Sequence, residues 1–149
     1  MEKARIIVLM EKIKIQDLNN TKMTMNFIEF PWHDAILKEI KIDRSNPGIN
    51  DMITLVVIWD TGSESIFYFK DVYYAKLDLN FGVIADECIS EVRYLPTDDN
   101  DVVPFIRKWQ SLVEDIANLF FIQIKTISTA SSIRIFAKNI VEVKCNNNV

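Results

Sequence analysis

The fold is decided by residues 52–69, which read MITLVVIWDTGSESIFYF. Residues 52–59 are apolar at every position except Thr54, a pattern typical of a central strand that is covered on both faces of a sheet. Asp60 to Ser63 then supply residue types that turns prefer, and residues 66–69 are apolar or aromatic again. The stretch therefore predicts a β-hairpin with residues 66–69 in the returning strand.

Three further strands are predicted outside this hairpin. Apolar and polar side chains alternate with a period close to two in the first, and in the last a strand is favoured over a helix. The first strand, residues 36–43, is joined to the hairpin by residues 44–51, a loop whose Asn46-Pro47-Gly48 sequence favours a turn. The last strand, residues 88–95, is followed by an acidic loop over residues 96–101. The three strands cover residues 36–43, residues 72–79 with an interruption around Ala75, and residues 88–95.

One long amphipathic helix is predicted over residues 103–118, where large apolar residues recur every three or four positions. Pro104 suits its first turn, and Asp99 and Asp101 suit the positive end of its dipole. Two runs of alternating apolar residues on either side of the turn region 126–132 then predict a C-terminal β-hairpin. We therefore expect an α+β domain, mostly antiparallel β-sheet with this helix packed on it.

The 149 residues are expected to form a single domain. Residues 1–22 join the pattern least clearly, so we expect them to form an N-terminal extension outside the main core, and residues 146–149 to form a frayed tail. The short apolar run over residues 6–10 is flanked by charges and suits neither a signal peptide nor a membrane span. A cytoplasmic protein with no membrane partner is expected.

The composition argues against nucleic acid, metal ions and cofactors as partners. The net charge is −4, and the lysines and arginines are scattered rather than gathered in a basic patch. Cys88 and Cys145 lie far apart, and a zinc site would require both to meet the single histidine. We therefore expect no nucleic acid, no metal and no cofactor.

The single histidine, His33, is followed by Asp34, and such a pair can act as a general base with its orienting carboxylate. Adjacent residues in a strand point to opposite faces, so the pair would need a turn to converge. No nucleophile stands in a recognisable elbow motif, and no catalytic residue is assigned. The favoured interpretation is that Trp32 anchors the start of the strand in the core while His33 or Asp34 bonds to backbone there.

Two acidic sequences resemble known functional loops. Asp60-Thr61-Gly62-Ser63 superficially matches the loop of aspartic proteases, but that chemistry needs a second aspartate loop, so a hairpin turn is favoured. Residues 98–101 could hold a cation, but they lack the central glycine and the terminal glutamate of a calcium loop. We interpret them as a solvated loop that caps the helix.

Aromatic side chains remain as candidates for a binding surface. They are enriched at protein interfaces, and several lie in or beside the predicted hairpin, although they also suit the core of a sheet. Together with the segment around the histidine, they give the candidate binding residues Trp32, His33, Asp34, Trp59, Tyr68, Tyr73 and Tyr74.

The sequence Trp32-His33-Asp34-Ala35, with the strands and the Lys108-Trp109 helix that follow it, resembles a loose group of small uncharacterised bacterial α+β proteins. These proteins open with a His-Asp-Ser/Ala element, and some of them are immunity proteins of polymorphic toxin systems. The resemblance covers about residues 26–144 and carries no catalytic residues. It implies a stoichiometric binding protein whose partner is encoded nearby.

The leading hypothesis is therefore a non-enzymatic domain that binds another protein, with neutralisation of a toxin as its specific form. An acidic surface would steer the partner and aromatic residues would anchor it. Two alternatives stay open: a small hydrolase-like enzyme that uses His33 with Asp34 or Asp60, and a homo-oligomeric structural module.

Overall fold

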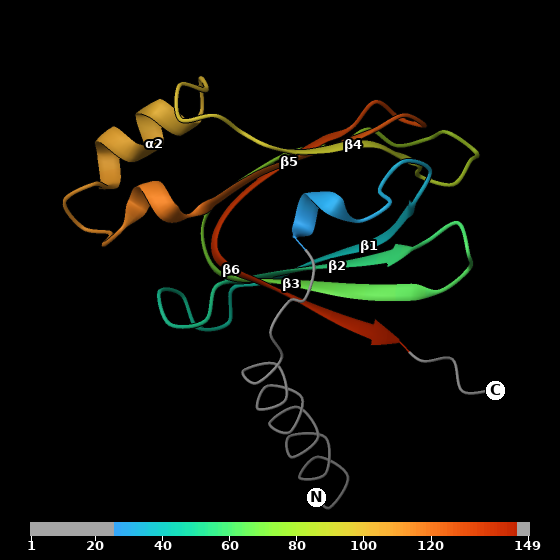
Figure 1. The fold of residues 1–149 in the computed structure, drawn as a ribbon, viewed down its shortest axis with the longest axis horizontal. Coiled ribbons are helices and arrows are strands. Elements are labelled where there is room, and N and C mark those ends of the chain that lie inside the picture. Colours follow the sequence, from blue (N-terminus) through green and yellow to red (C-terminus); the bar gives the residue numbers. More distant parts are fainter. Residues whose placement is uncertain (1–25, 146–149) are drawn as a thin grey trace, which may run out of the picture.

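The computed structural model describes residues 26–145, which form a six-stranded antiparallel sheet and one α-helix (Figure 1). The predicted dominance of an antiparallel sheet is confirmed, and the strands follow the order β1-β2-β3-β6-β5-β4. The predicted extension over residues 1–22 and the predicted frayed tail over residues 146–149 lie outside the described residues. In chain order the elements are η1 (Phe27–Glu29), β1 (Ile36–Asp43), β2 (Met52–Ile58), β3 (Glu64–Asp78), β4 (Ile89–Tyr94), α2 (Val102–Trp109), η2 (Ile116–Asn118), β5 (Phe120–Thr126) and β6 (Ser132–Cys145).

The hairpin predicted from residues 52–69 is formed by β2 and β3, which pair over the whole length of β2. The N–H of Gly62 donates to the carbonyl of Trp59 (2.9 Å) in the connecting turn, and Gly62 has a φ of +85° that favours glycine. Residues of β2 alternate between buried and partly exposed positions. The prediction that this strand is covered on both faces is therefore wrong, because one face keeps contact with water.

Strand β3 is unbroken over its 15 residues but is bent near its middle. Asp71 has a left-handed conformation with a φ of +51°, and the register with β6 shifts between Val72 and Tyr74, as in a β-bulge. The predicted interruption around Ala75 is therefore a bulge placed slightly earlier. The bend folds the long ribbon of β3 and β6 over, so that the sheet forms two layers (Figure 1).

The edge strands β1 and β4 meet where the bent sheet comes round on itself. The Asp34 N–H donates to the Ile89 carbonyl (3.0 Å), and the Ile89 N–H donates to the Ala35 carbonyl (2.7 Å). Beside them, Ile36 and Cys88 form an isolated β-bridge. These backbone bonds give the sheet a barrel-like closure around the main core.

An aromatic cluster fills one end of this core. The rings of Phe27, Phe30, Trp32, Trp59 and Phe67 lie with neighbouring centroids between 4.8 and 6.1 Å apart. Trp32 is buried, and its Nε1–H donates to the carbonyl of Phe27 (2.6 Å). Because buried aromatic pairs stabilise beyond the area that they bury, this cluster holds the short η1 segment against the sheet. Trp32 thus anchors the segment before β1 in the core.

A second apolar core lies on the other face of the sheet, under α2. Val102 and Phe105 of the helix are buried with Phe121 of β5 and Phe136 of β6. The ring centroids of Phe105 and Phe136 are 5.2 Å apart, and Tyr74 of β3 stacks on Phe136 at 4.6 Å. The helix is therefore held by the three strands β3, β5 and β6.

The helix is shorter than the predicted span of residues 103–118, because α2 ends at Trp109. Asp115 has a left-handed φ of +53°, which an α-helix cannot include, and the chain turns through η2 to enter β5. Val113 and Ile116 still pack against the second core. The three- and four-residue spacing of these apolar residues therefore indicates contact with the second core and does not indicate a continuous helix.

The predicted C-terminal hairpin is present in part. Strands β5 and β6 pair from Phe120 opposite Ala137 to Lys125 opposite Ser132. Strand β6 then runs on to Cys145 and pairs with β3 over both of its halves. The last strand is therefore a central member of the sheet and not only one arm of a terminal hairpin.

Phe67→Ala and Phe81→Ala form a matched test of the core. Phe67 is fully buried, so F67A should lower the free energy of unfolding by about 3–5 kcal/mol. Phe81 is 84% exposed, so F81A should change the free energy of unfolding by no more than about 0.5 kcal/mol. Urea unfolding followed by tryptophan fluorescence measures both. Equal effects of the two substitutions would contradict this placement of the core.

Candidate functional site

A groove lies where three segments that are far apart in the sequence meet beside the bulge of β3. The segments are the loop between β1 and β2, the bulge itself and the turn that follows α2, and the groove has a volume of about 330 Å³. We name it the Tyr73 groove. Its lining residues are Gly48, Ile49, Asp51, Asp71, Val72, Tyr73, Trp109, Leu112 and Val113.

Backbone and side-chain hydrogen bonds hold the loop against the bulge. The N–H of Val72 donates to the carbonyl of Asp51 (3.1 Å). Within the loop, the Asp51 carboxylate accepts a hydrogen bond from the N–H of Gly48 (2.8 Å), whose φ is +80°. The predicted turn at Asn46-Pro47-Gly48 therefore fixes the position of Ile49 at the groove.

Large apolar side chains are exposed around the Tyr73 groove. Ile49 is 75% exposed, Leu112 is 74% exposed and Tyr73 is 46% exposed. An adjoining cavity of about 450 Å³ shares Tyr73 with the groove and continues past Ile42, which is also exposed. Single exposed apolar residues are normal on a protein surface, but a group of them around a hollow is typical of an interaction site.

The Tyr73 groove carries negative charge. Within residues 26–145, its lining contains the carboxylates of Asp51 and Asp71 and no lysine, arginine or histidine. Neither carboxylate forms an ion pair within the described part of the chain. The adjoining cavity adds Asp43, and hydrogen bonds from the hydroxyl and the N–H of Ser45 hold the pKa of this carboxyl below its ordinary value.

Of the candidate aromatic residues, only Tyr73 lines this groove. Trp32 and Trp59 are buried with ring centroids 5.0 Å apart, so their rings belong to the aromatic cluster of the core. Tyr74 is half-buried and reaches only the adjoining cavity. Tyr68 is half-buried, and this burial raises the pKa of its phenol.

Sequence reasoning missed most of the groove. The three- and four-residue spacing assigns Trp109, Leu112 and Val113 to the buried face of a long helix. Because α2 ends at Trp109, Leu112 lies instead in the turn that follows and is exposed. One signal could have found the site: Ile49 is a large apolar residue in an otherwise polar loop directly after a Pro-Gly turn.

His33 and Asp34 do converge, because they occupy a turn. Asp34 has a φ of +67°, and His33 Nδ1 lies 3.0 Å from Asp34 Oδ2. Their side chains are 79% and 69% exposed, and neither residue lines the Tyr73 groove or the adjoining cavity. The N–H of Asp34 donates to the carbonyl of Ile89, so the turn also takes part in closing the sheet.

Asp60 lies exposed in the turn between β2 and β3. The hydroxyls of Thr61 and Ser63 are 2.8 Å apart within this turn, and the N–H of Trp59 donates to the Ser63 carbonyl (2.9 Å). The interpretation of this sequence as a hairpin turn is confirmed. Among the residues that the structure describes, Asp34 and not Asp60 is the carboxylate within ion-pair distance of His33.

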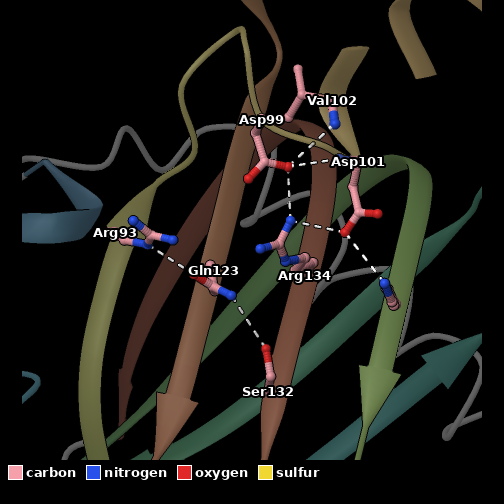
Figure 2. A network of polar contacts seen from close by, with 8 residues as sticks. Arg93, Asp99, Asp101, Val102, Gln123, Ser132 and Arg134 are labelled. Carbon is pink, nitrogen blue, oxygen red and sulfur yellow. Dashed lines mark hydrogen bonds and ion pairs between the residues drawn. The ribbon is translucent and has the colours of Figure 1, made fainter. Parts of the chain in front are cut away.

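The acidic loop before α2 forms ion pairs with basic side chains of the same chain. Arg134 Nη1 lies 2.8 Å from Asp99 Oδ1 and 2.8 Å from Asp101 Oδ2 (Figure 2). Lys76 Nζ lies 3.5 Å from Asp101 Oδ2. Between residues 26 and 145, no three histidine, cysteine or carboxylate side chains gather as a metal site would require. The loop therefore fastens the start of α2 to β6.

The surroundings of Asp99 favour its charged form. Burial by itself raises the pKa of this carboxyl, but the N–H of Asp101, the Arg134 guanidinium and the N–H of Val102 outweigh burial and hold the pKa below its ordinary value. Such a carboxylate stabilises the folded state above the pKa of the unfolded chain. The contribution is lost as the pH falls through the pKa of the folded state.

Comparison of the chain with protein-family models, with curated proteins and with solved structures finds no match. No helix within residues 26–145 combines the length and the apolar character that crossing a bilayer requires. The resemblance to immunity proteins therefore stays a prediction from the sequence, and the geometry of the Tyr73 groove is the basis for a functional proposal.

Asp99→Asn tests the carboxylate at the start of α2. At neutral pH, D99N should lower the free energy of unfolding by about 1–3 kcal/mol, because a largely buried charge-assisted hydrogen bond is lost. The difference from the wild type should shrink as the pH falls below about 4, where the unfolded carboxyl takes up a proton. Urea unfolding at neutral pH and in steps down to about pH 3 measures it. Asp98→Asn, at an exposed position, is the control, and a difference that stays constant with pH would contradict the assignment.

Proposed function

We propose that this protein is a non-enzymatic domain that acts by binding another protein, and that the partner is a toxin that it neutralises. The observation that carries the proposal is the Tyr73 groove, where exposed apolar side chains from three separate segments surround a hollow. Protein interfaces are built in this way, with aromatic and aliphatic anchors in a pocket at the centre.

The chemistry of the groove suits binding better than catalysis. Its titratable lining residues are Asp51, Asp71 and Tyr73. A nucleophile with a neighbouring base, which covalent catalysis needs, is not among the lining residues. Ile49 and Leu112 would instead leave water when a partner docks, and burial of apolar area contributes roughly 25 cal/mol per Å².

The frame of the groove also suits a preformed binding surface. The hydrogen bond between Val72 and Asp51 fixes the loop to the bulge, and the Arg134 ion pairs fix the start of α2 to the sheet. A surface that is ordered before the partner arrives loses less conformational entropy on binding. The geometry therefore supports a docking surface that needs little rearrangement.

The toxin as partner is proposed on the resemblance of Trp32-His33-Asp34-Ala35 and the strands that follow to proteins that include immunity proteins. Such a protein would act stoichiometrically in the cytoplasm against a toxin encoded beside it. The net charge of −4 is consistent with electrostatic steering of a basic partner.

One observation favours the enzyme alternative. His33 Nδ1 lies 3.0 Å from Asp34 Oδ2, as in a general base with its orienting carboxylate. Both side chains are exposed, and they line neither the Tyr73 groove nor the adjoining cavity. The His33→Ala variant separates the two proposals, since a binding protein keeps its effect and an enzyme that uses His33 loses it.

Co-expression with the product of the adjacent gene tests the proposed function. Cells that carry this product should grow only when the protein is present, and the two proteins should co-purify. Tyr73→Ala combined with Leu112→Ala should weaken binding at least about tenfold in calorimetry, because the pair removes two central anchors. The matched control is Phe81→Ala combined with Ile84→Ala, another exposed apolar pair, which should bind as the wild type does.

Failure to restore growth would contradict toxin neutralisation. Equal weakening by the two double variants would contradict the Tyr73 groove as the binding surface. Loss of protection in H33A, with the fold intact by circular dichroism, would favour the enzyme.

A further inference from the structure

We propose that the Tyr73 groove receives a segment of the partner that combines apolar side chains with arginine or lysine residues. This inference rests on the proposed function, because it names the kind of partner that the same surface accepts. It follows from the placement of two carboxylates within an otherwise apolar lining.

The apolar part of the segment is required by the sides of the groove. Ile49 comes from the loop between β1 and β2, Leu112 comes from the turn after α2, and about three-quarters of each residue is exposed. The half-buried Val72, Trp109 and Val113 complete the apolar lining. An apolar side chain placed among these residues leaves water on several sides at once, which is the setting in which interface anchors contribute most.

The basic part of the segment is required by the carboxylates. If an apolar partner covered Asp51 and Asp71, both would lose hydration without gaining an opposite charge, at a cost of several kcal/mol for each ion. A guanidinium or ammonium group from the partner offsets this cost. Arg44 lines the adjoining cavity and not the groove, so the groove is the more acidic of the two hollows.

Tyr73 is the aromatic residue of the groove that favours the same partner chemistry. Lys108 Nζ lies 5.0 Å from the ring centroid of Trp109, so a cation of the chain itself already occupies one aromatic ring of the lining. Tyr73 offers a second ring in the same lining as Asp71. An arginine can stack on an aromatic face and pair with a carboxylate at the same time, which suits this combination.

A second copy of this chain fits the groove less well. Among the described residues outside the groove, Phe81, Val83 and Ile84 form an exposed apolar segment, whereas Ile42 and Ile127 are exposed singly. Asp78 and Asp86 flank this segment in the sequence. Docking it in the Tyr73 groove would bring like charges together, which is unfavourable. The occupant of the groove is therefore a different protein that carries basic residues.

Nuclear magnetic resonance of the isotope-labelled full chain tests the inference with two synthetic peptides. In the first peptide, leucine and arginine alternate, and in the second, neutral citrulline replaces each arginine. The arginine peptide should shift the amide signals of Tyr73 and Leu112 and the indole signal of Trp109 in a saturable way. The citrulline peptide should bind at least about fivefold more weakly, because its side chains cannot pair with the carboxylates.

Asp51→Asn combined with Asp71→Asn removes the charges with little change of shape. Asparagine tolerates the left-handed conformation of Asp71, and its carbonyl can accept the hydrogen bond that Gly48 donates to Asp51. This double variant should bind the arginine peptide at least about fivefold more weakly and with less dependence on salt. The control is Asp60→Asn combined with Asp98→Asn, which removes two exposed carboxylates elsewhere and should bind as the wild type does.

Equal binding of the two peptides, unchanged binding by the D51N/D71N variant, or shifts confined to other residues would overturn the inference. So would a dimer in light scattering that the Y73A/L112A variant abolishes, because a second copy would then fill the groove.

The product of the adjacent gene separates the two proposals. If it binds the wild type and D51N/D71N equally, the proposed function stands and this inference is wrong. If it does not bind the wild type, the proposed toxin is wrong and the peptides decide this inference.

Discussion

The bulge at Asp71, Val72 and Tyr73 is the constraint on which the other features of this structure depend. It bends the long ribbon of β3 and β6, so one antiparallel sheet encloses the main core on one face and carries α2 on the other. The same bend brings the edge strands β1 and β4 together. Because the extra residue of a bulge changes the direction of its side chain, Tyr73 also lies exposed between the loop after β1 and the turn after α2.

The strands could be predicted from the sequence because each has a local pattern, and β1, the central hairpin and β4 all lie close to their predicted positions. The helix was predicted too long because Val113 and Ile116 keep helical spacing and pack against the second core, although α2 ends at Trp109. The groove could not be predicted in the same way. Its residues come from three segments whose meeting depends on the bulge, and nothing in the local sequence around Ile49 or Leu112 encodes that bend.

Aspartates in this protein have two opposite electrostatic environments. Asp99 and Asp101 lie against Arg134, and Asp101 also lies against Lys76, so their charges are paired within the fold (Figure 2). Asp51 and Asp71 lie in the lining of the groove and have no ion pair within the described part of the chain. Asp51, Asp99 and Asp101 all occur in polar loops and look alike in the sequence, whereas Asp71 lies in the bulge of β3. The paired carboxylates differ from Asp51 and Asp71 because Arg134, on a strand more than thirty residues from the acidic loop, and Lys76 lie beside them.

The sheet closes incompletely and leaves one strand edge open, which affects how readily the protein aggregates. Beyond Leu37, β1 pairs with β2 on one side and, among residues 26–145, has no strand on the other. A free strand edge can recruit the edge of another chain and start a fibril. Lys38, Glu39 and Lys41 are exposed along this edge, and a new ladder would have to crowd and desolvate their charges. The chain can therefore display apolar residues for recognition while charge protects this open edge of β1 from amyloid-like growth.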